Sequence, residues 1–420
     1  MDVYLFPAVV GGGLGDIEEV LAAGRELSRA GFRTVRYRRP GHPMPRSVDG
    51  PWEWPPIERR TRLAPRAPAA LTISPAWGVS AAPTRNEAYG RGGAWEFECR
   101  DVERRYGRSS TLHVSLEEFA RTLGSVEENR ERLREGGVTS RALPAALVRS
   151  RRAGELERLR RAFVRYRAFD RANVVHLFAT FRRSPRFARE FPEAVQVGPL
   201  WPRRFSRVSE SLPRAHRREW VWYASPASAE RIAPEVVEAL SVVHPPVHLY
   251  VRTPRSWTLS LPADRVEIAT GAVDPEEWHR RFARAELRIV TGSRTLLEAI
   301  ELGGPFLYFN GVLGPGARRR RHRPEKVIAL LDVFRRARVN EGLRQDLADF
   351  ARGRRVGAVV RKAAGRGGGW RRFPRRLPSG GFRPPYDDAG EVIVALARAL
   401  ERTPHDAENI VSRARAGALH

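Results

Sequence analysis

The chain has 420 residues, too many for one ordinary core and suited to two domains of about 200 residues each, and a hydrophobic content of 42% excludes disorder throughout. The formal net charge of +27 favours a phosphate-bearing partner, although 75 − 2 = 73 of the basic residues are arginine, a bias that a GC-rich genome also produces. No run approaches the about 18 apolar residues of a membrane span, and the single cysteine, Cys99, excludes a disulfide framework and a cysteine-based zinc site.

The first elements alternate between strand and helix. The apolar run Val3–Val10 predicts a strand that is buried on both faces of a parallel sheet. Apolar residues then recur at helical spacing over Ile17–Ala30, and Gly31 lies where a helix-ending glycine belongs. Phe32–Tyr37 predicts a second strand. The chain therefore opens with a βαβ unit, the start of a doubly wound sheet.

The rest of the first half is less regular. Arg38–Ala69 is rich in proline and lacks periodicity, so we expect a long loop or insertion there, either a variable surface loop or one that faces an acceptor or membrane. Ala70–Trp77 predicts a strand and Glu155–Phe169 an amphipathic helix. Two further strands are expected near 174–180 and 194–200, before an arginine-rich boundary at 198–218.

The second half repeats this architecture. Strands are expected at 219–225, 246–252, 265–270, 286–291 and 305–309. Helices are expected at 228–243, 274–285, 293–304, 324–337, 340–353 and, closing the chain, 389–402. Asp274 is a suitable N-cap, with Pro275 in the first helical position. The predicted fold is therefore α/β, with two Rossmann-like doubly wound parallel-sheet domains at 1–205 and 206–385, which face each other across a cleft, and a C-terminal segment at 386–420 that packs back on the first domain.

One segment of the second half has the pattern of a ligand site. In IVTGSRTLLEAIELGGPFLYFN, from Ile289 to Asn310, a strand ends in a short polar turn and a helix begins at once. Ligands of open α/β sheets bind at the carboxyl ends of the strands. A helix start also presents N–H groups and the positive end of the helix dipole, which suit a diphosphate. Ser293 and Thr295 can add hydroxyl donors to such a site.

This segment resembles the donor-binding signature of GT-B glycosyltransferases, in particular the lipid-linked N-acetylglucosaminyltransferases of peptidoglycan synthesis. The matching positions are Gly292, Ser293, Thr295, Glu298, Ala299, Gly303 and Pro305. The resemblance implies that Thr291, Gly292, Ser293 and Thr295 hold the diphosphate of a nucleotide-sugar, and that Glu298 accepts hydrogen bonds from the ribose hydroxyls. The alternative for Glu298 is a carboxylate that only favours the helix dipole.

Further donor contacts are expected at the ends of other strands. Ser225 lies where the family has a Gly-Ser turn, but the surrounding SPASAE lacks the glycines. Arg252 ends a strand and can approach the same diphosphate, or it is an ordinary surface arginine. The arginine run after FNGVLGPG supplies phosphate-contact candidates or forms a solvated loop: Arg318, Arg319, Arg320 and Arg321.

The first half is expected to supply the acceptor side and the catalytic base. The acceptor-side glycine loop contains Gly11, Gly12, Gly13 and Gly15. Many GT-B enzymes have a histidine after this loop, whereas this chain has Asp16, which resembles the catalytic aspartate of heptose-transferring members. An aspartate can take the proton from an acceptor hydroxyl. The alternative is that Asp16 is the N-cap of the first helix.

The resemblance implies a hexosyl- or N-acetylhexosaminyltransferase that binds a nucleotide-sugar, UDP-linked by analogy, and a hydroxyl acceptor, with a lipid-linked or cell-envelope glycan as one candidate acceptor. No cofactor and no metal are expected, because the helix dipole and arginines can stabilise the departing diphosphate. We expect a cytoplasmic protein, with peripheral attachment to an anionic inner membrane face left open. Three alternatives remain: a nucleotide-sugar 2-epimerase, a GT-B-like protein that has lost catalysis and, although no nucleic-acid motif is present, a nucleic-acid-binding protein.

Overall fold

The protein, described here by a computed structural model, divides into two compact units. Unit 1 contains Met1–Trp201 and Pro384–His420, and unit 2 contains Pro202–Arg383. The structure describes residues 1–6, 15–38, 57–59, 67–75, 102–117, 172–179, 194–201, 218–224, 226–253, 259, 262, 264–270, 274–309, 330–331, 334–335, 338–365, 370 and 388–419.

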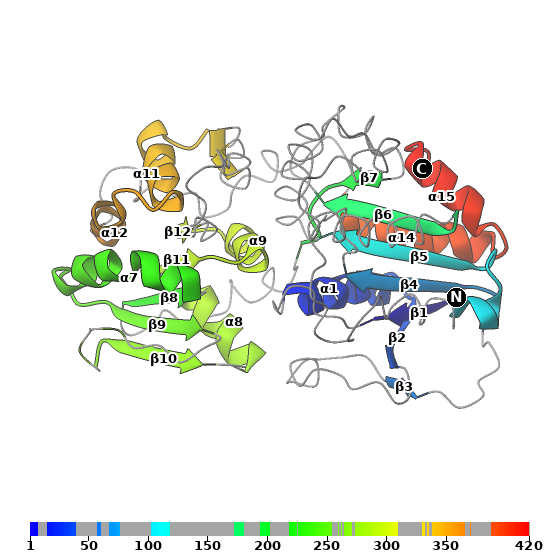
Figure 1. Cartoon of the computed structure of the whole chain (residues 1–420), viewed down its shortest axis with the longest axis horizontal. Helices are drawn as coiled ribbons and strands as arrows, with labels where there is room; N and C mark the ends of the chain where they lie inside the picture. The colour runs from blue at the N-terminus through cyan, green and yellow to red at the C-terminus, as the bar shows by residue number, and fades with distance from the viewer. Residues whose placement is uncertain are drawn as a thin grey trace, which may run out of the picture. The chain divides into compact units, whose positions relative to one another are not determined.

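Unit 1 is built on a seven-stranded sheet in which every pair of neighbouring strands is parallel (Figure 1). The spatial order is β3-β2-β1-β4-β5-β6-β7. The strands are β1 (Asp2–Leu5), β2 (Arg33–Arg38), β3 (Ile57–Arg59), β4 (Ala70–Pro75), β5 (Thr111–Glu117), β6 (Val174–Ala179) and β7 (Ala194–Val197). The strand order reverses between β1 and β4, which is the place where doubly wound sheets bind ligands at their carboxyl edge.

Helix α1 (Gly15–Arg29) follows β1 and packs directly on it. Gly24 makes this close approach possible, since a Cβ atom at that position would lie 2.5 Å from Cδ1 of Leu5. The helix ends as the sequence predicts, because Gly31 adopts the left-handed conformation with φ of 92°. The predicted opening βαβ unit is therefore present.

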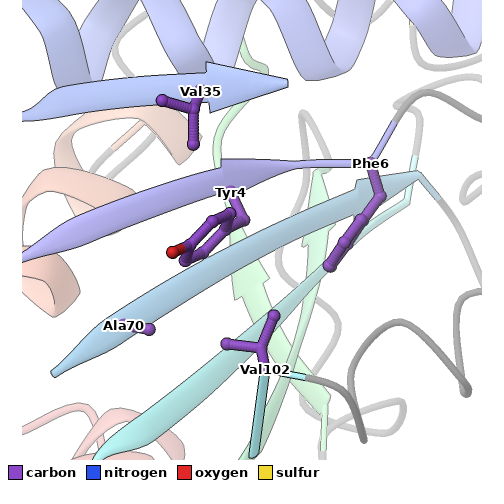
Figure 2. Packing of buried hydrophobic residues seen from close by; sticks show 5 residues of the cluster. All are labelled: Tyr4, Phe6, Val35, Ala70 and Val102. Carbon is purple, nitrogen blue, oxygen red and sulfur yellow. The ribbon is translucent and has the colours of Figure 1, made fainter. Parts of the chain in front are cut away.

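The other face of the β1 region carries an apolar cluster, shown in Figure 2. Tyr4 and Phe6 of the first strand gather there with Val35, Ala70 and Val102. Tyr4 also enters a polar chain: its hydroxyl lies 2.7 Å from the hydroxyl of Tyr106, which donates to Asp2 Oδ2 at 2.7 Å. Burial, together with these two partners, raises the pKa of Tyr106. The phenol therefore stays protonated and ties the segment before β5 to the sheet.

The C-terminal segment returns to unit 1 as two helices, α14 (Ala389–Arg402) and α15 (Ala407–Arg415). Helix α14 starts with a capping box between Asp388 and Glu391 and packs on α1, while α15 packs on β5 and β6. Gly198 at the end of β7 accepts a backbone hydrogen bond from Ala389. The expectation that 389–402 is the last helix is wrong, because α15 follows after a turn of only four residues, too short to stand out as a separate loop.

Unit 2 contains a five-stranded sheet that is also parallel throughout, in the order β10-β9-β8-β11-β12. Its strands are β8 (Glu219–Tyr223), β9 (His248–Thr253), β10 (Val266–Thr270), β11 (Leu287–Val290) and β12 (Phe306–Tyr308). Its helices are α7 (Pro226–Ser241), α8 (Pro275–Arg284), α9 (Ser293–Leu302), α11 (Glu341–Ala351) and α12 (Val356–Ala364). The predicted fold class, an α/β protein with two doubly wound parallel sheets, is confirmed.

The helices of unit 2 lie on both faces of its sheet. The chain moves outward from β8 to β10 and then crosses to β11 and β12 on the other side. Because parallel crossovers are right-handed, α7 covers one face, and α8 and α9 cover the other. Helices α11 and α12 pack beside α7 and β12, as Figure 1 also shows. The strand order of unit 2 therefore reverses between β8 and β11.

One buried arginine ties α8 and α9 to the sheet. Arg288 of β11 donates to the carbonyl oxygens of Phe282 at 2.6 Å, Ala283 at 3.0 Å and Gly303 at 2.9 Å. Two of these carbonyls belong to the last turn of α8, and the third follows α9 directly. Burial lowers the pKa of Arg288 to about 10, so the side chain remains a cation at neutral pH. The cation therefore holds both helix ends where their dipoles are negative.

Several sequence expectations need correction. The region 38–69, expected to be only a loop, contains the short edge strand β3, which pairs with β2. Strand β5 and helix α12 were not predicted at all. The expected continuation of the first strand to Val10 and the helix Glu155–Phe169 lie outside the described residues, as does most of the helix expected at 324–337.

Candidate functional site

The candidate site lies at the carboxyl ends of β8 and β11, where the strand order of unit 2 reverses. This is the position at which doubly wound sheets bind their ligands. Thr291, the first residue after β11, donates its hydroxyl hydrogen to the carbonyl oxygen of Tyr223, the last residue of β8, at 2.9 Å. The Thr291 hydroxyl therefore joins the two strand ends, so its predicted contact with a ligand requires this bond to open or to be shared.

Helix α9 begins at this edge with a glycine as its N-cap. The backbone of Gly292 is extended, with φ of −90° and ψ of 155°, and within the described part of the chain no side chain caps the helix. By contrast, side chains cap the starts of α8 and α11: Asp274, as predicted, accepts from Glu276 N, and Asn340 accepts from Gly342 N. The N-terminal N–H groups and the positive dipole end of α9 are therefore not neutralised by a cap residue.

Gly292 also allows a close approach of its neighbours. A Cβ atom on this residue would lie 3.1 Å from Oγ1 of Thr295 and 3.3 Å from Cε1 of Tyr223. The Tyr223 ring therefore lies directly beside the start of α9. Thr295 Oγ1 donates to the Gly292 carbonyl oxygen at 3.0 Å, so its hydroxyl is engaged within the first turn. Ser293 occupies the first helical position.

Glu298, the residue predicted to bind a ribose, is buried in the second turn of α9, with 3% of its surface exposed. Its Oε1 atom lies 3.9 Å from Nε2 of His279, which belongs to α8. The structure thus puts Glu298 on α9, one turn after the Gly292 N-cap. It also gives the carboxylate a neighbour that the sequence analysis did not identify.

Arg252, the predicted phosphate contact near the end of β9, is held by aromatic rings. Its Cζ atom lies 5.1 Å from the ring centre of Trp278 and 5.9 Å from that of Tyr223. The Arg252 side chain is half-buried, and among the described residues it has no hydrogen-bond or ion-pair partner. Arg281 of α8 differs, since it contacts the Tyr250 ring at 4.2 Å and also pairs with three carboxylates.

The structure therefore brings six of the seven predicted donor residues to one edge of unit 2. Five of them lie next to or within the first two turns of α9, and the sixth, Arg252, lies on β9, two strands away from β11. Tyr223 and Trp278 belong to the same cluster and were missed. The register of β8 and β9 brings Tyr223 beside Arg252, and the packing of α8 brings Trp278 to both, so no local sequence signal identifies the cluster.

On unit 1, α1 starts at Gly15 and includes Asp16 in its first turn. The N-cap alternative for Asp16 would require the helix to begin at Ile17, two residues later. The helix start follows β1, at the reversal of the unit 1 sheet, which is the expected ligand edge of that sheet. The remaining predicted residues lie outside the described part of the chain: Gly11, Gly12, Gly13, Ser225, Arg318, Arg319, Arg320 and Arg321.

Unit 1 also contains a buried polar network that the sequence analysis did not predict. His113 of β5, which is 1% exposed, lies 2.7 Å from Thr72 Oγ1 through Nδ1 and 3.1 Å from Glu103 Oε1 through Nε2. Asn173 donates to the same Glu103 oxygen at 2.8 Å and to the carbonyl oxygen of Thr111 at 3.0 Å. Because Thr72, His113 and Asn173 are fully buried, this network holds β4, β5 and the start of β6 together.

The described residues contain no group of three or more His, Cys, Asp or Glu side chains that could hold a metal ion. Among the helices that the structure describes, none is long and apolar enough to cross a membrane.

No protein-family model and no curated protein matches the chain. Solved structures of glycosyltransferases are similar to it along nearly its whole length. MurG of Acinetobacter baumannii shows 13% identity and a TM-score of 0.40, over 95% of this chain and 99% of that one. The spinosyn rhamnosyltransferase SpnG shows 14% identity and a TM-score of 0.45, over 96% and 100%. Phytolacca americana UGT2, complexed with UDP-2-fluoro-glucose and pterostilbene, shows 11% identity and a TM-score of 0.44, over 100% of both chains.

Proposed function

We propose that this chain is a glycosyltransferase that binds a nucleotide-sugar at the carboxyl edge of the unit 2 sheet and transfers the sugar to a hydroxyl acceptor. One observation carries the proposal: Tyr223, at the reversal of strand order, contacts both the start of α9, which its N-cap residue Gly292 leaves uncapped, and an arginine whose side chain has no anionic partner among the described residues. Both features favour a bound anion. A diphosphate is the anion that a nucleotide-sugar brings to such an edge.

In this reaction the bond between the anomeric carbon and the diphosphate oxygen breaks, and the acceptor oxygen bonds to the anomeric carbon. The charge that develops on the leaving diphosphate is stabilised by the α9 start and by the Arg252 guanidinium. These groups do the work that a metal ion does elsewhere, so the proposed transfer is independent of metal. The proton of the acceptor hydroxyl passes to the carboxylate of Asp16 in unit 1, which acts as the general base.

Glu298 is proposed to accept hydrogen bonds from the ribose hydroxyls of the donor. Its place one turn into α9 supports this role, and its burial beside His279 supports the alternative of a structural carboxylate. Glu298→Gln separates the two. Loss of nucleotide affinity at unchanged thermal stability supports the ribose contact, whereas loss of stability with unchanged affinity would make Glu298 structural.

The proposed acceptor carries a phosphate or lies at an anionic surface, because the net charge of +27 favours such partners. A lipid-linked or cell-envelope glycan at the inner membrane face fits this requirement. The transferred group is proposed to be a hexosyl or N-acetylhexosaminyl residue, by the resemblance of the 289–310 segment.

A thermal-shift panel of UDP, GDP, ADP and thymidine diphosphate tests the proposed donor class. Two of the four nucleotides are chosen from the similar structures: UDP is part of the UDP-sugar bound in one of them, and thymidine diphosphate is bound in another. A ligand at a hundred times its Kd stabilises the folded state by about 2.7 kcal/mol, which is easily measured. We expect at least one diphosphate to raise the Tm in the absence of added metal and in the presence of a chelator. If none of the four nucleotides changes the Tm, the proposal is wrong.

A further inference from the structure

We infer that Trp278 and Tyr223 are positioning residues that hold Arg252 as the clamp for the second phosphate, so that the site selects a nucleoside diphosphate over a monophosphate. The inference rests on the proposed function and names the residues of this chain that would set its phosphate selectivity. Trp278 and Tyr223 act through Arg252, whose guanidinium makes the phosphate contact.

The strand register puts Arg252 beside Tyr223. The two residues are partners in the parallel pairing of β8 with β9, so both side chains project from the same face of the sheet. This is the face covered by α8, and Trp278 of that helix meets the Tyr223 ring edge-on, with ring centres 6.0 Å apart. The guanidinium of Arg252 therefore lies against two rings that are themselves in contact.

The Trp278 ring is fixed within the core of unit 2. It is 2% exposed and also packs against Phe282, with ring centres 5.1 Å apart, and against Tyr250 at 6.4 Å. Helix α8 is in turn capped by Asp274 and tied to the sheet through Arg281. We call the Trp278 and Tyr223 rings the aromatic platform of Arg252. Large, rigid rings give this platform a defined geometry at low entropic cost.

An arginine held on aromatic rings keeps its N–H groups for another partner. The rings attract the flat face of the guanidinium, and the N–H groups around its rim can still donate to a phosphate in bidentate geometry. Arg281 shows the contrasting case, because carboxylates of Glu219, Glu267 and Glu277 accept from its N–H groups. Among the described residues, the carboxylates that engage Arg281 have no counterpart at Arg252, so the N–H groups of Arg252 can donate to a ligand.

The Tyr223 ring lies close to both Arg252 and the start of α9. Its centre is 5.9 Å from the Arg252 Cζ atom, and its Cε1 atom is 3.3 Å from the position that a Cβ atom of Gly292 would take. One phosphate can therefore occupy the N-terminus of α9 while the next one meets Arg252. A monophosphate would fill the first position only.

The test compares the Kd of a nucleoside diphosphate with the Kd of the matching monophosphate in the full chain, by calorimetry without metal. UDP and UMP are the probes, or the pair with the base that stabilises the chain most. Arg252→Gln removes the clamp, Arg252→Lys keeps a charge without a planar fork, and Trp278→Leu and Trp278→Phe change the platform. Arg280→Gln is the control for the loss of one positive charge, because Arg280 is exposed on α8, the helix that carries Trp278.

We expect Arg252→Gln to weaken diphosphate binding about 10–100-fold, the loss of charge-assisted hydrogen bonds, and to change monophosphate binding less than about threefold. Trp278→Leu should weaken diphosphate binding about 3–30-fold, which corresponds to the free energy of one cation–π contact. Trp278→Phe keeps an aromatic ring, so its diphosphate Kd should stay close to that of the unmodified chain. Arg252→Lys should be intermediate. The Arg280 control should match the unmodified chain.

Two outcomes distinguish this inference from the proposed function. If the unmodified chain binds no nucleotide, both are wrong. If it binds the diphosphate but Arg252→Gln leaves the ratio of the two Kd values unchanged, the clamp is wrong and the donor site stands. Should Trp278→Leu unfold the chain, Tyr223→Leu takes its place, because the Tyr223 ring also contacts Arg252. A folded Trp278→Leu or Tyr223→Leu variant with an unchanged ratio of the two Kd values overturns the positioning role.

Discussion

Replacement of Arg288 by methionine tests whether one buried cation holds α8 and α9 against the sheet. The variant loses three hydrogen bonds to backbone carbonyls. Hydrogen bonds that involve a charged group contribute about 1.5–3 kcal/mol each, so roughly 5–9 kcal/mol is lost. Burial of the cation costs about 3 kcal/mol, because it lowers the pKa from the usual arginine value to about 10 and each pKa unit corresponds to about 1.4 kcal/mol. Methionine recovers this cost, and we expect a net loss of about 4 kcal/mol.

The assay for Arg288→Met is urea unfolding followed by tryptophan fluorescence, since Trp220, Trp222 and Trp278 report on the unit 2 core. The transition of unit 2 should move to lower urea at an unchanged m-value. Arg280→Met, exposed on α8, is the control and should lie within about 0.5 kcal/mol of the unmodified chain. A free energy of unfolding for Arg288→Met that matches this control would refute the helix-tethering role.

Three further substitutions test other parts of the account. Asp16→Asn should lower the rate of sugar transfer about 100-fold or more at an unchanged nucleotide Kd, and a fully active variant would exclude Asp16 as the base. His113→Leu removes the imidazole that joins Thr72 to Glu103 and should cost about 1–3 kcal/mol of unfolding free energy, without an effect on nucleotide binding. Gly24→Ala places a methyl group against Cδ1 of Leu5 and should lower the free energy of unfolding by about 1–3 kcal/mol, measured by thermal unfolding. Unchanged stability would show that α1 can move away from β1.

Strands with continuous apolar runs were predictable from the sequence, because strands of a covered parallel sheet are buried on both faces. β8 and β9 are of this kind. β5 was missed because polar residues alternate along it, and His113 and Ser115 are polar yet buried. Such residues are acceptable in a core only when partners satisfy them, and the partners Thr72 and Glu103 come from other parts of the chain.

The short elements were also beyond prediction. β3 has three residues in a proline-rich segment, too few for any periodicity, and its strand character comes from pairing with β2. The N-cap of α12 is Arg355, whose φ is 52°, and the N–H of Gly357 in the first turn donates to the carboxylate of Glu235 of α7. A helix start that is capped by a residue more than a hundred positions away leaves no local signal.

The candidate site was predictable where it follows one continuous segment. The Thr-Gly-Ser turn and the helix after it are local, and the structure has both at the reversal of strand order. The aromatic platform was not predictable, because Tyr223, Arg252 and Trp278 come from three elements, and only the strand order makes them neighbours. The role of Thr295 also depends on atomic detail, since its hydroxyl is engaged by Gly292.

The most direct test of the central claim is diphosphate binding to Gly292→Asp. Aspartate is a strong N-cap and the extended backbone of Gly292 suits it, so α9 should still form. The new Cβ atom presses on Thr295 Oγ1 and on the Tyr223 ring and lowers the free energy of unfolding, and Gly292→Ser shares this effect. The aspartate carboxylate would satisfy the N–H groups of the first turn and repel an anion. Gly292→Ser caps the helix without the charge and serves as the control.

We predict that Gly292→Asp binds the nucleoside diphosphate at least about 30-fold more weakly in calorimetry, a loss of roughly 2 kcal/mol or more, and that Gly292→Ser falls between it and the unmodified chain. Binding of the diphosphate by a folded Gly292→Asp variant with unchanged affinity would contradict the claim that the start of α9 holds the phosphates.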